Sequence, residues 1–447
     1  MITDFYDLIG ILVTEKIKTG VILLNFEMTV SVVIFVLTYI MIVWDKFDRA
    51  VVALSGAALM IFFNFLNQKE AFEEVDFNTI GLLIGMMIIV MVTKRSGIFE
   101  YLAVKMVKFA KAEPIKIIIY LSIVTGILSA LLDNVTTILL ILPVTLGIAR
   151  DLKLNPVPFI IAEVFASNTG GAATLIGDPP NILIGSAVGF SFMDFIKNSA
   201  VIVIPLLFLT TFLFALMYKK KLKTPDGVKQ ALLAIDESKF LKDKVLLIKS
   251  VVILALVVIG FLLHGVFHYE SATIAMSGAV LLLLISGIKP EKIFHEVEWK
   301  TIFFFIGLFI LVGGIKATGV IELLAEKTLE ITQGDVVLAA ISILWLSAIA
   351  SAFIDNIPFV TTMIPLIQKL GALSNMNIIP LWWALSLGAC LGGNGTIIGA
   401  SANVIAVGLA EENGHKITFG HFLRNAFPMM LLTIVISTVY LFVFYLR

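Results

Sequence analysis

The sequence predicts an all-α polytopic membrane protein made of two inverted-topology repeats. First, 59% of its 447 residues are hydrophobic and only 14% are charged, whereas globular domains carry about 25% charged residues. Second, apolar stretches long enough to cross a bilayer, about 17–25 residues each, recur from end to end. Third, the second half of the chain repeats the first: one constant shift places Asp133-Asn134 on Asp355-Asn356 and Gly177 on Gly399.

The composition also excludes other classes of protein. The 32 basic and 32 acidic residues cancel to a net charge of zero, which excludes a nucleic-acid binder that works by bulk positive charge. Runs such as Val251–Leu263 lack the alternation of β-barrel strands. The single Cys390 excludes an internal disulfide and a cysteine-cluster metal site. The five His show no metal-ligand spacing, so we expect no metal other than a transported or coupling sodium ion.

The apolar runs divide the chain into four parts. Residues 1–25 are expected to form an interfacial segment, and residues 219–245 a lysine-rich cytoplasmic connector. The first repeat occupies residues 26–218, and the second occupies residues 246–447. The expected spans lie near residues 28–44, 50–67, 79–94, 157–190 and 197–218 in the first repeat, and near 247–264, 272–288, 301–315, 378–410 and 426–445 in the second. A short extra span within 1–25 would raise these ten to eleven.

Loop charges give the relative orientation of the repeats. Residues 94–116 carry six Lys or Arg and two Glu, whereas the matching residues 316–338 carry two Lys and four acidic residues. Because basic loops stay in the cytoplasm, matching loops lie on opposite sides of the membrane. Inverted repeats need an odd number of crossings each, so the paired apolar arms at 114–150 and 336–370 are predicted to be re-entrant hairpins. Each repeat then has five transmembrane helices plus one hairpin.

Each hairpin turns at an acidic tip, Asp133-Asn134 in the first repeat and Asp355-Asn356 in the second. A carboxylate inside a span costs about 2.5–3.5 kcal/mol on insertion scales and should face protein or water. The functional interpretation is that each Asp binds a coupling cation or carries a proton. Both residues can also cap the helix that follows, and the two roles are compatible.

Glycine and proline clusters interrupt the spans 157–190 and 378–410, which are therefore predicted to be discontinuous helices. Unwound backbone at membrane depth is tolerated where it lines a cavity or is buried in protein. Its carbonyls can ligate a cation, and the half-helix N-termini favour an anion. A glycine-lined helix crossing is the structural alternative. The substrate-binding residues expected from the hairpins and loops are Thr136, Thr137, Asn168, Thr169, Thr174, Asn181, Thr361, Thr362, Asn394, Thr396 and Asn403.

Glu163 lies in an apolar span without an acidic counterpart in the second repeat. It is either a proton relay or a buried structural carboxylate. No nucleotide-binding Gly-x-x-x-x-Gly-Lys-Ser/Thr motif occurs, so we expect no cofactor and an ion gradient as the energy source. A separate ATPase partner is not indicated.

The motifs Leu132–Thr137 and Gly170–Asn181 resemble those of the ion transporter superfamily. The similarity is to its group of arsenite-pump membrane proteins, sodium/proton antiporters and the melanosomal P protein, which have a citrate-transporter-like domain, and more distantly to the divalent-anion/sodium symporters. The resemblance implies a homodimer with elevator-like motion. It also implies two cation or proton sites, formed by Ser129, Asp133, Asn134 and Gly171 in one half and by Ser351, Asp355, Asn356 and Gly393 in the other.

The sequence departs from those symporters, which have a Ser-Asn-Thr tip, by placing an Asp at both tips. A titratable carboxylate there makes proton coupling more plausible. We expect a secondary active transporter of the plasma (inner) membrane, driven by protons or sodium, that moves a small anion or oxyacid such as arsenite, antimonite or a citrate-like anion. The lone Cys390 offers little thiolate ligation for arsenite. The alternative is a sodium/proton antiporter. A channel is less consistent with the motifs. An aspartyl enzyme is also less consistent with them, and it would need its two carboxylates about 3 Å apart.

Overall fold

The computed structural model describes residues 26–44, 46–219, 236–267 and 269–447, and four further residues of the connector, Leu222, Lys229, Gln230 and Leu233. All regular structure in this part of the chain is helical. The predicted interfacial segment 1–25 lies outside the described residues, as do twelve of the 27 residues of the predicted connector, all of them between residues 220 and 235.

The first half of the described chain is a series of α-helices. The main ones are α2 (Phe26–Trp44), α3 (Arg49–Phe62), α4 (Gln68–Glu73), α5 (Phe77–Lys94), α6 (Ile98–Phe109), α7 (Pro114–Leu131), α8 (Asn134–Asp151), α9 (Val157–Gly171), α10 (Pro179–Val188) and α12 (Val201–Tyr218). A short helix α11 (Phe192–Phe195) and a π-helical turn (Ile196–Ala200) lead into α12.

The second half has a matching series of helices. They are α14 (Lys244–Phe267), α15 (Ser271–Ser286), α16 (Pro290–Phe294), α17 (Trp299–Ala317), α18 (Val320–Thr332), α19 (Val336–Phe353), α20 (Asn356–Leu373), α21 (Ile379–Gly392), α22 (Ser401–Glu412) and α23 (Phe419–Tyr445). The shift that aligns the two halves of the sequence carries the first residue of each helix from α5 to α10 onto the first residue of its counterpart among α17 to α22. This agreement supports the predicted internal repeat.

Nine helices in the described chain are long and apolar enough to cross a membrane. The nine differ from the ten predicted spans for two reasons. They include hairpin arms such as α7, α8 and α19, and they omit α3, α15 and α21, which are apolar but shorter than 18 residues. The multi-pass helical architecture is confirmed, whereas the number of crossings stays a prediction.

Several predicted boundaries need correction. The span expected at 50–67 ends at Phe62, and the chain then turns through Asn64, which has a positive φ of 59°. A separate short helix, α4, follows because Asn67 and Glu70 form a capping box at its start. The segments between α5 and α7 and between α17 and α19 are also helical. These helices, α6 and α18, are amphipathic, which the search for uniformly apolar spans could not detect.

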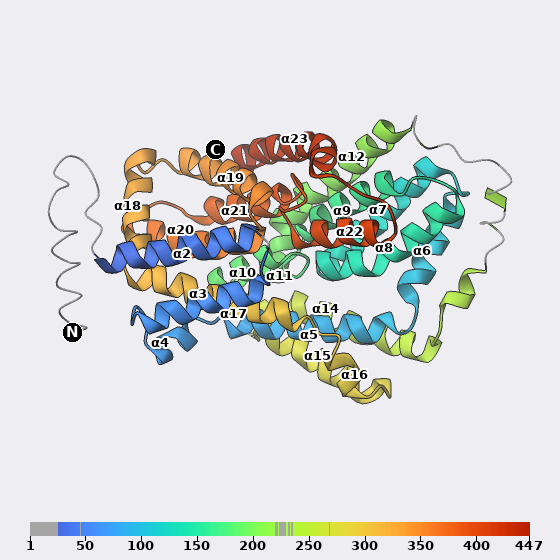
Figure 1. The fold of residues 1–447 in the computed structure, drawn as a ribbon, viewed down its shortest axis with the longest axis horizontal. Coiled ribbons are helices and arrows are strands. Elements are labelled where there is room, and N and C mark those ends of the chain that lie inside the picture. The colour runs from blue at the N-terminus through green and yellow to red at the C-terminus, as the bar shows by residue number, and fades with distance from the viewer. Residues whose placement is uncertain are drawn as a thin grey trace.

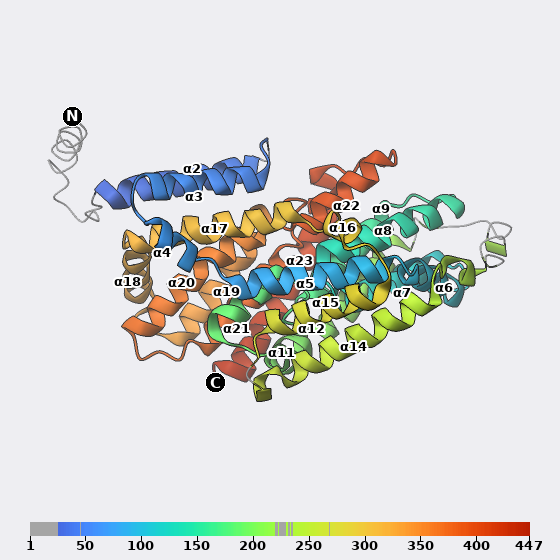
Figure 2. The ribbon, with the colours of Figure 1, turned by 90° about the horizontal axis from the view of Figure 1, so that it is seen from below.

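Two layers of three helices lie beside a bundle, and their helices α17 and α5 contact each other. One layer packs α17 against α2 and α3, and the other packs α5 against α14 and α15. Each layer therefore combines helices from both halves of the chain. Figure 2 shows α2 and α3 along one side of the molecule and α14 along the opposite side. The bundle contains the hairpins α7–α8 and α19–α20, the helices α9, α10, α21 and α22, and the long α12 and α23 (Figure 1).

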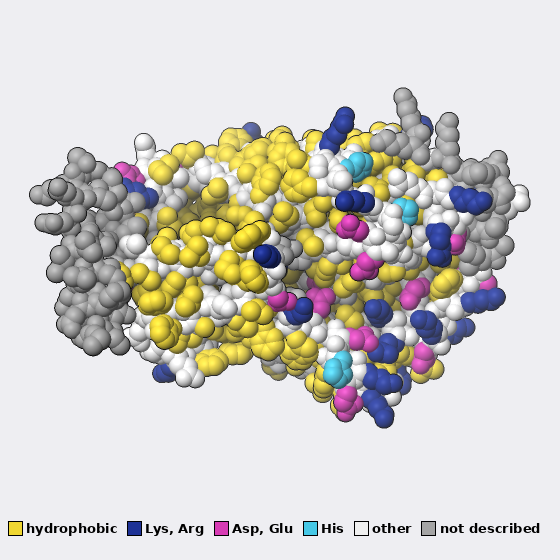
Figure 3. All heavy atoms as spheres, viewed as in Figure 1, with side chains coloured by type: hydrophobic (Ala, Val, Ile, Leu, Met, Phe, Trp, Pro, Cys, Tyr) yellow, Lys and Arg dark blue, Asp and Glu magenta, His cyan; other side chains and the backbone are white. Residues whose placement is uncertain are grey.

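Apolar side chains cover a broad area of the surface, and charged side chains gather toward one end of the face in Figure 3. Val251, Leu256 and Ile259 on α14 are more than two-fifths exposed, as are Val439 and Phe444 on α23. Exposed apolar area of this extent indicates a surface that contacts lipid.

Close packing in the bundle depends on small residues. At Gly170 in α9, a Cβ atom would overlap the carbonyl oxygen of Gly126 in α7. Small residues allow two helix backbones to approach this closely in a membrane protein. The glycine-lined crossing considered from the sequence is therefore present, beside the break in the helix.

Gly170→Ala is expected to lower the free energy of unfolding by about 1–3 kcal/mol, the usual cost of overpacking. Gly408→Ala in α22 is the matched control, because no atom lies within 4 Å of the added Cβ atom. The control should leave stability unchanged or raise it by up to about 1 kcal/mol, since alanine favours a helix. Unfolding in detergent, followed by circular dichroism, measures both changes. Equal stability of the two variants would contradict the packing argument.

Candidate functional site

Both hairpin tips are helix caps. Asp133 precedes α8, and its carboxylate accepts hydrogen bonds from the Thr136 backbone N–H at 2.7 Å and the Thr136 hydroxyl at 2.5 Å. Asp355 precedes α20 and accepts from the Ile357 N–H at 3.2 Å. The predicted capping role is confirmed for both. A cap uses only part of a carboxylate's capacity to accept hydrogen bonds, so the caps leave room for a second function.

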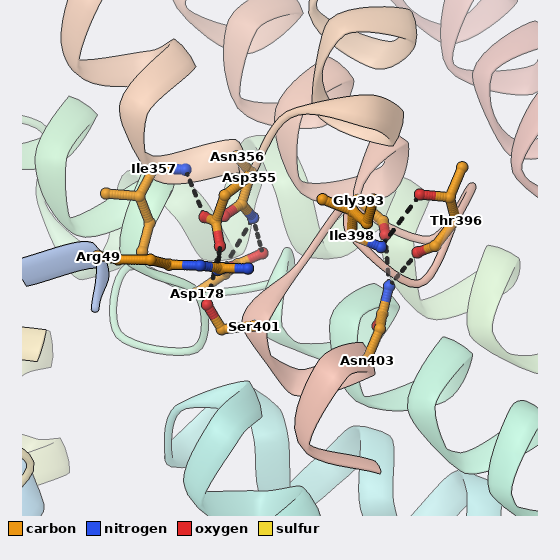
Figure 4. Close-up of polar contacts among 10 residues, drawn as sticks. All are labelled: Arg49, Asp178, Asp355, Asn356, Ile357, Gly393, Thr396, Ile398, Ser401 and Asn403. Carbon is orange, nitrogen blue, oxygen red and sulfur yellow. Dashed lines mark hydrogen bonds and ion pairs between the residues drawn. The ribbon is translucent and has the colours of Figure 1, made fainter. Parts of the chain in front are cut away.

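The two helices predicted to be discontinuous are interrupted. The first breaks between Gly171 and Pro179, and the second between Gly392 and Ser401. An asparagine spans each break in the same way. The Asn181 amide donates to the carbonyls of Ala172 and Thr174 at 3.2 and 2.9 Å. The Asn403 amide donates to the carbonyls of Gly393 and Thr396 at 2.8 and 2.7 Å (Figure 4).

Four of the predicted substrate-binding residues therefore use their donor groups in hydrogen bonds to backbone carbonyls. Besides Asn181 and Asn403, the hydroxyl of Thr174 donates to the Ala130 carbonyl at 2.5 Å. The hydroxyl of Thr396 donates in the same way to the Ala352 carbonyl. These bonds tie each loop to the first arm of the neighbouring hairpin. All four residues shape the loops, and substrate contact by them stays a prediction.

A chain of amides joins the two halves at the centre of the bundle. The Asn134 amide donates to the Asn168 side-chain oxygen at 3.0 Å. The Asn168 amide in turn donates to the side-chain oxygens of Asn394 and Asn403, at 3.1 and 2.8 Å. The Asn394 amide donates to the Thr169 hydroxyl at 3.3 Å. Predicted site residues from both repeats are thus brought into direct contact.

Asp178 is the buried carboxylate that connects the two hairpins. It is 0% exposed and lies between Gly177 and Pro179 in the first unwound loop. Its Oδ1 accepts hydrogen bonds from the Asn134 and Asn356 amides, each at 3.3 Å. Sequence reasoning did not select Asp178, although an acidic residue next to a helix break in an apolar span was a signal that could have found it.

An acidic cavity of about 220 Å³ lies beside these contacts. Its lining includes the carboxylates of Asp133, Asp178 and Glu298 and the amides of Asn134 and Asn356, and it includes no basic residue in the described chain. Glu298 also accepts a hydrogen bond from the Thr301 hydroxyl at 3.1 Å. The sequence prediction missed Glu298 because an acidic residue at the start of a span reads as an ordinary cap.

A second, basic cavity of about 460 Å³ adjoins the first. Lys46, Arg49 and Lys300 line it, together with the single acidic side chain of Asp48, which pairs with Lys300 at 2.9 Å. The two cavities share three lining residues, Thr301, Ile357 and Ser401.

An ion pair lies where the cavities meet. Arg49 Nη1 is 3.0 Å from Asp355 Oδ2, and the Ser401 hydroxyl donates to the same oxygen at 2.8 Å (Figure 4). The Asp355 side chain is 3% exposed and that of Arg49 is 20% exposed. Arg49 is separated from Asp355 by 306 residues, so no local pattern could have predicted the pair.

The other predicted coupling residues lie around the loops. The Ser167 hydroxyl donates to the Ser129 hydroxyl at 3.2 Å, and the Ser351 hydroxyl donates to the Ala389 carbonyl at 2.7 Å. Gly171 and Gly393 lie at the two helix breaks. Neither these two glycines nor Ser129 and Ser351 line either cavity within the described chain, so their part in cation binding stays a prediction.

The predicted threonines have mixed surroundings. The Thr361 hydroxyl donates to the Ile357 carbonyl at 2.9 Å, and the Thr362 hydroxyl lies 2.7 Å from that of Tyr39. The Thr137 hydroxyl is buried and has no hydrogen-bond partner within the described structure. Thr137 lines neither cavity in the described chain, so its contact with a ligand stays a prediction.

Glu163 is held apart from both cavities in the described chain. Both of its carboxylate oxygens accept from the Thr145 hydroxyl, at 2.9 and 3.0 Å. This arrangement suits a buried structural carboxylate, and a proton-relay role stays untested. Asp133 and Asp355 cap different hairpins and share no hydrogen bond in the part of the chain that is described, an arrangement unlike that of an aspartyl enzyme.

Sequence similarity to other proteins extends along almost the whole chain. An uncharacterized transporter of Mycobacterium tuberculosis is 42% identical over 422 residues, covering 93% of this chain and 98% of the relative. The human P protein is 32% identical over 501 residues, covering 93% of this chain and 60% of the relative. This similarity confirms the resemblance to the P-protein group inferred from the motifs.

A solved structure shares the fold. The YdaH transporter of Alcanivorax borkumensis superposes with a TM-score of 0.59 at 13% sequence identity, covering 93% of this chain and 98% of that one. Residues 39–388 match the family model described as "Citrate transporter". On the extent of that match and the identity of its relatives, the chain belongs to the citrate transporter family, a family of membrane transporters and not of enzymes.

Proposed function

We propose that this protein is a secondary active transporter that couples the movement of a small anion to a proton or sodium gradient. One observation carries the proposal: an acidic cavity and a basic cavity adjoin at the tip of the second hairpin and share Thr301, Ile357 and Ser401. Opposite charges placed side by side suit a cation and an anion that travel together.

The acidic cavity is the proposed cation site. Asp133, Asp178 and Glu298 offer carboxylate oxygens, and Asn134 and Asn356 contribute amide groups. Intramembrane carboxylates of this kind commonly bind ions or relay protons in transporters. In transporters with broken helices, coupling ions also bind near the unwound segments. The cavity therefore fits either a proton shared among carboxylates or a sodium ion with oxygen ligands.

The basic cavity is the proposed anion site. Three basic side chains face one acidic side chain, so its lining carries a net formal positive charge. The Arg49 guanidinium can form paired, charge-assisted hydrogen bonds with a carboxylate. The positive charge strengthens the binding of a citrate-like anion. It contributes little to the binding of arsenite, which is a neutral acid near neutral pH. The charge distribution therefore favours a carboxylate anion over arsenite or antimonite.

The helical arrangement supports an elevator-like movement. We propose two inverted-topology repeats, with the bundle of hairpins and broken helices moving against the two outer layers. α6 and α18 connect layers to bundle, and each begins after a glycine with a φ of 81°, Gly97 and Gly319. Such positions can act as hinges. The proposal includes a homodimer in the plasma membrane.

Sodium/proton antiport without an anion is the second candidate. Three carboxylates line the acidic cavity without a basic residue among its described lining. Such a site can exchange a sodium ion for protons by itself. The two candidates differ in whether an anion moves with the cation.

Flux into proteoliposomes tests the proposal. Proton and sodium gradients are imposed separately, and uptake of citrate, succinate, phosphate, arsenite and chloride is measured. Gradient-driven uptake of a carboxylate anion is the expected result. Sodium-for-proton exchange that no anion changes would favour the antiporter instead, and flux that persists without either gradient would indicate a channel.

Asp133→Asn is expected to reduce gradient-driven flux about tenfold or more, because a charge-assisted contact is worth about 1.5–3 kcal/mol. Asparagine keeps an oxygen that can cap α8, so the fold should persist. Asp335→Asn is the matched control, since Asp335 caps α19 at an exposed position. Wild-type coupling in the Asp133 variant would remove this residue from the cation site.

Asp178→Asn and Glu163→Gln form a second comparison between buried carboxylates. The Asp178 variant is expected to lose the dependence of flux on the cation gradient, because one of the three acidic groups of the cavity becomes neutral. The Glu163 variant should keep that dependence, because its carboxylate bonds only to Thr145 in the described chain. Flux measured against sodium concentration and pH checks both. Loss of coupling in the Glu163 variant alone would instead support a proton relay there.

A further inference from the structure

We propose that the Arg49–Asp355 ion pair makes anion binding and cation binding depend on each other, an inference that rests on the proposed function. The pair would be broken whenever the transporter is loaded: the anion takes Arg49, and the cation takes Asp355. Each ligand thereby prepares the site of the other.

The position of the pair supports this exchange. Arg49 lines the basic cavity, and Asp355 Oδ2 receives both Arg49, at 3.0 Å, and the Ser401 hydroxyl, at 2.8 Å. Ser401 lines both cavities. Figure 4 shows the guanidinium and the carboxylate facing each other beside Ser401 and Asp178. Asp355 also directly precedes Asn356, which lines the acidic cavity, so the carboxylate is close to the sites of both ligands.

Charge and burial make the two ligands interdependent. An anion that draws Arg49 away leaves Asp355 as a carboxylate with only 3% exposure and no compensating charge, which is unfavourable. A proton or sodium ion at Asp355 removes that penalty. Conversely, a cation at Asp355 competes with Arg49 and releases the guanidinium toward the basic cavity. By linkage, each ligand must strengthen the binding of the other by the same factor.

The arrangement is confined to one hairpin. In the alignment of the two repeats, the position that matches Arg49 is Ser271, which carries no charge. Asp133, the counterpart of Asp355, forms no ion pair within the described chain and bonds to Thr136. The first hairpin therefore presents a carboxylate ready for a cation, whereas the second presents one whose charge is already balanced. Interdependence should arise at Asp355 and not at Asp133.

The pair also joins two parts of the fold. Arg49 is the first residue of α3, in the layer with α2 and α17, and Asp355 caps α20 in the bundle. An ion pair across this boundary restrains the bundle while both ligands are absent. Loading with both ligands releases this restraint, whereas one ligand alone leaves a buried charge unpaired.

Calorimetry on the purified full-length protein tests the inference. Citrate binding is measured at low and high sodium concentration and at acidic and alkaline pH. The coupling ratio is the citrate Kd at low cation concentration divided by the Kd at high cation concentration. In the wild type, citrate should bind about tenfold or more tightly at high concentration of the coupling cation, within the usual range of coupling between sites.

Two charge-neutralising variants test whether the coupling between citrate and cation binding depends on the ion pair. Arg49→Gln and Asp355→Asn should each lower the coupling ratio about tenfold relative to wild type, because either change removes the competition. The double variant Arg49→Gln/Asp355→Asn should fold even where a single variant does not, since it leaves no buried charge unpaired. It should also show the lowered ratio. Arg424→Gln removes an exposed charge on α23 and controls for effects of salt and pH on citrate itself.

The possible outcomes separate this inference from the proposed function. A wild-type ratio that equals the ratio of both single variants, or of the double variant, would overturn the inference and leave cation-coupled transport standing. If the wild type binds no citrate under any condition and shows no anion flux, the proposed anion transport fails, and the inference fails with it.

Discussion

Hydrogen bonding within and between the two broken helices holds the centre of the protein together. Inside a bilayer no water is present to satisfy a broken helix, so broken backbone needs partners from the protein. Asn181 and Asn403 donate to carbonyls of each loop, and Asn168 in α9 joins the two broken helices through Asn394 and Asn403. Without these amides, the breaks that open space for ligands would expose unpaired polar groups. The acidic cavity lies beside this network, since Asn134, Asp178 and Asn356 line it.

The same network places a buried carboxylate between the two hairpin tips. Asp178 accepts from Asn134 and Asn356, so both hairpin tips contact one buried carboxylate. Buried charges are expensive unless they are paired or bound to an ion. The second hairpin meets this requirement with Arg49, whereas Asp133 in the first forms no ion pair in the described chain. Near-symmetric repeats thus form an asymmetric pair of cavities, an acidic one and a basic one, which we propose bind the cation and the anion.

Much of the local structure could be predicted from the sequence. The hairpin arms predicted at 114–150 and 336–370 correspond to α7–α8 and α19–α20. The breaks predicted in 157–190 and 378–410 occur at Gly171–Pro179 and Gly392–Ser401. These features depend on short-range composition: apolar runs form helices, and Asp-Asn pairs or glycine and proline clusters end them. The amphipathic α6 and α18 were not predicted, because the polar residues on one face of each helix interrupt the apolar run that marks a span.

The sequence by itself therefore determined a multi-pass helical membrane protein, the constant shift that relates its halves, and which residues sit at hairpin tips and helix breaks. Only the tertiary structure decided which side chains meet. It paired Arg49 with Asp355, placed Asp178 between the two tips, and added Glu298 to a cavity with Asp133. Such contacts depend on how helices from both halves pack, and no local pattern encodes a partner 306 residues away. The partner of each buried charged side chain is therefore decided by the packing of the helices and not by the neighbouring sequence.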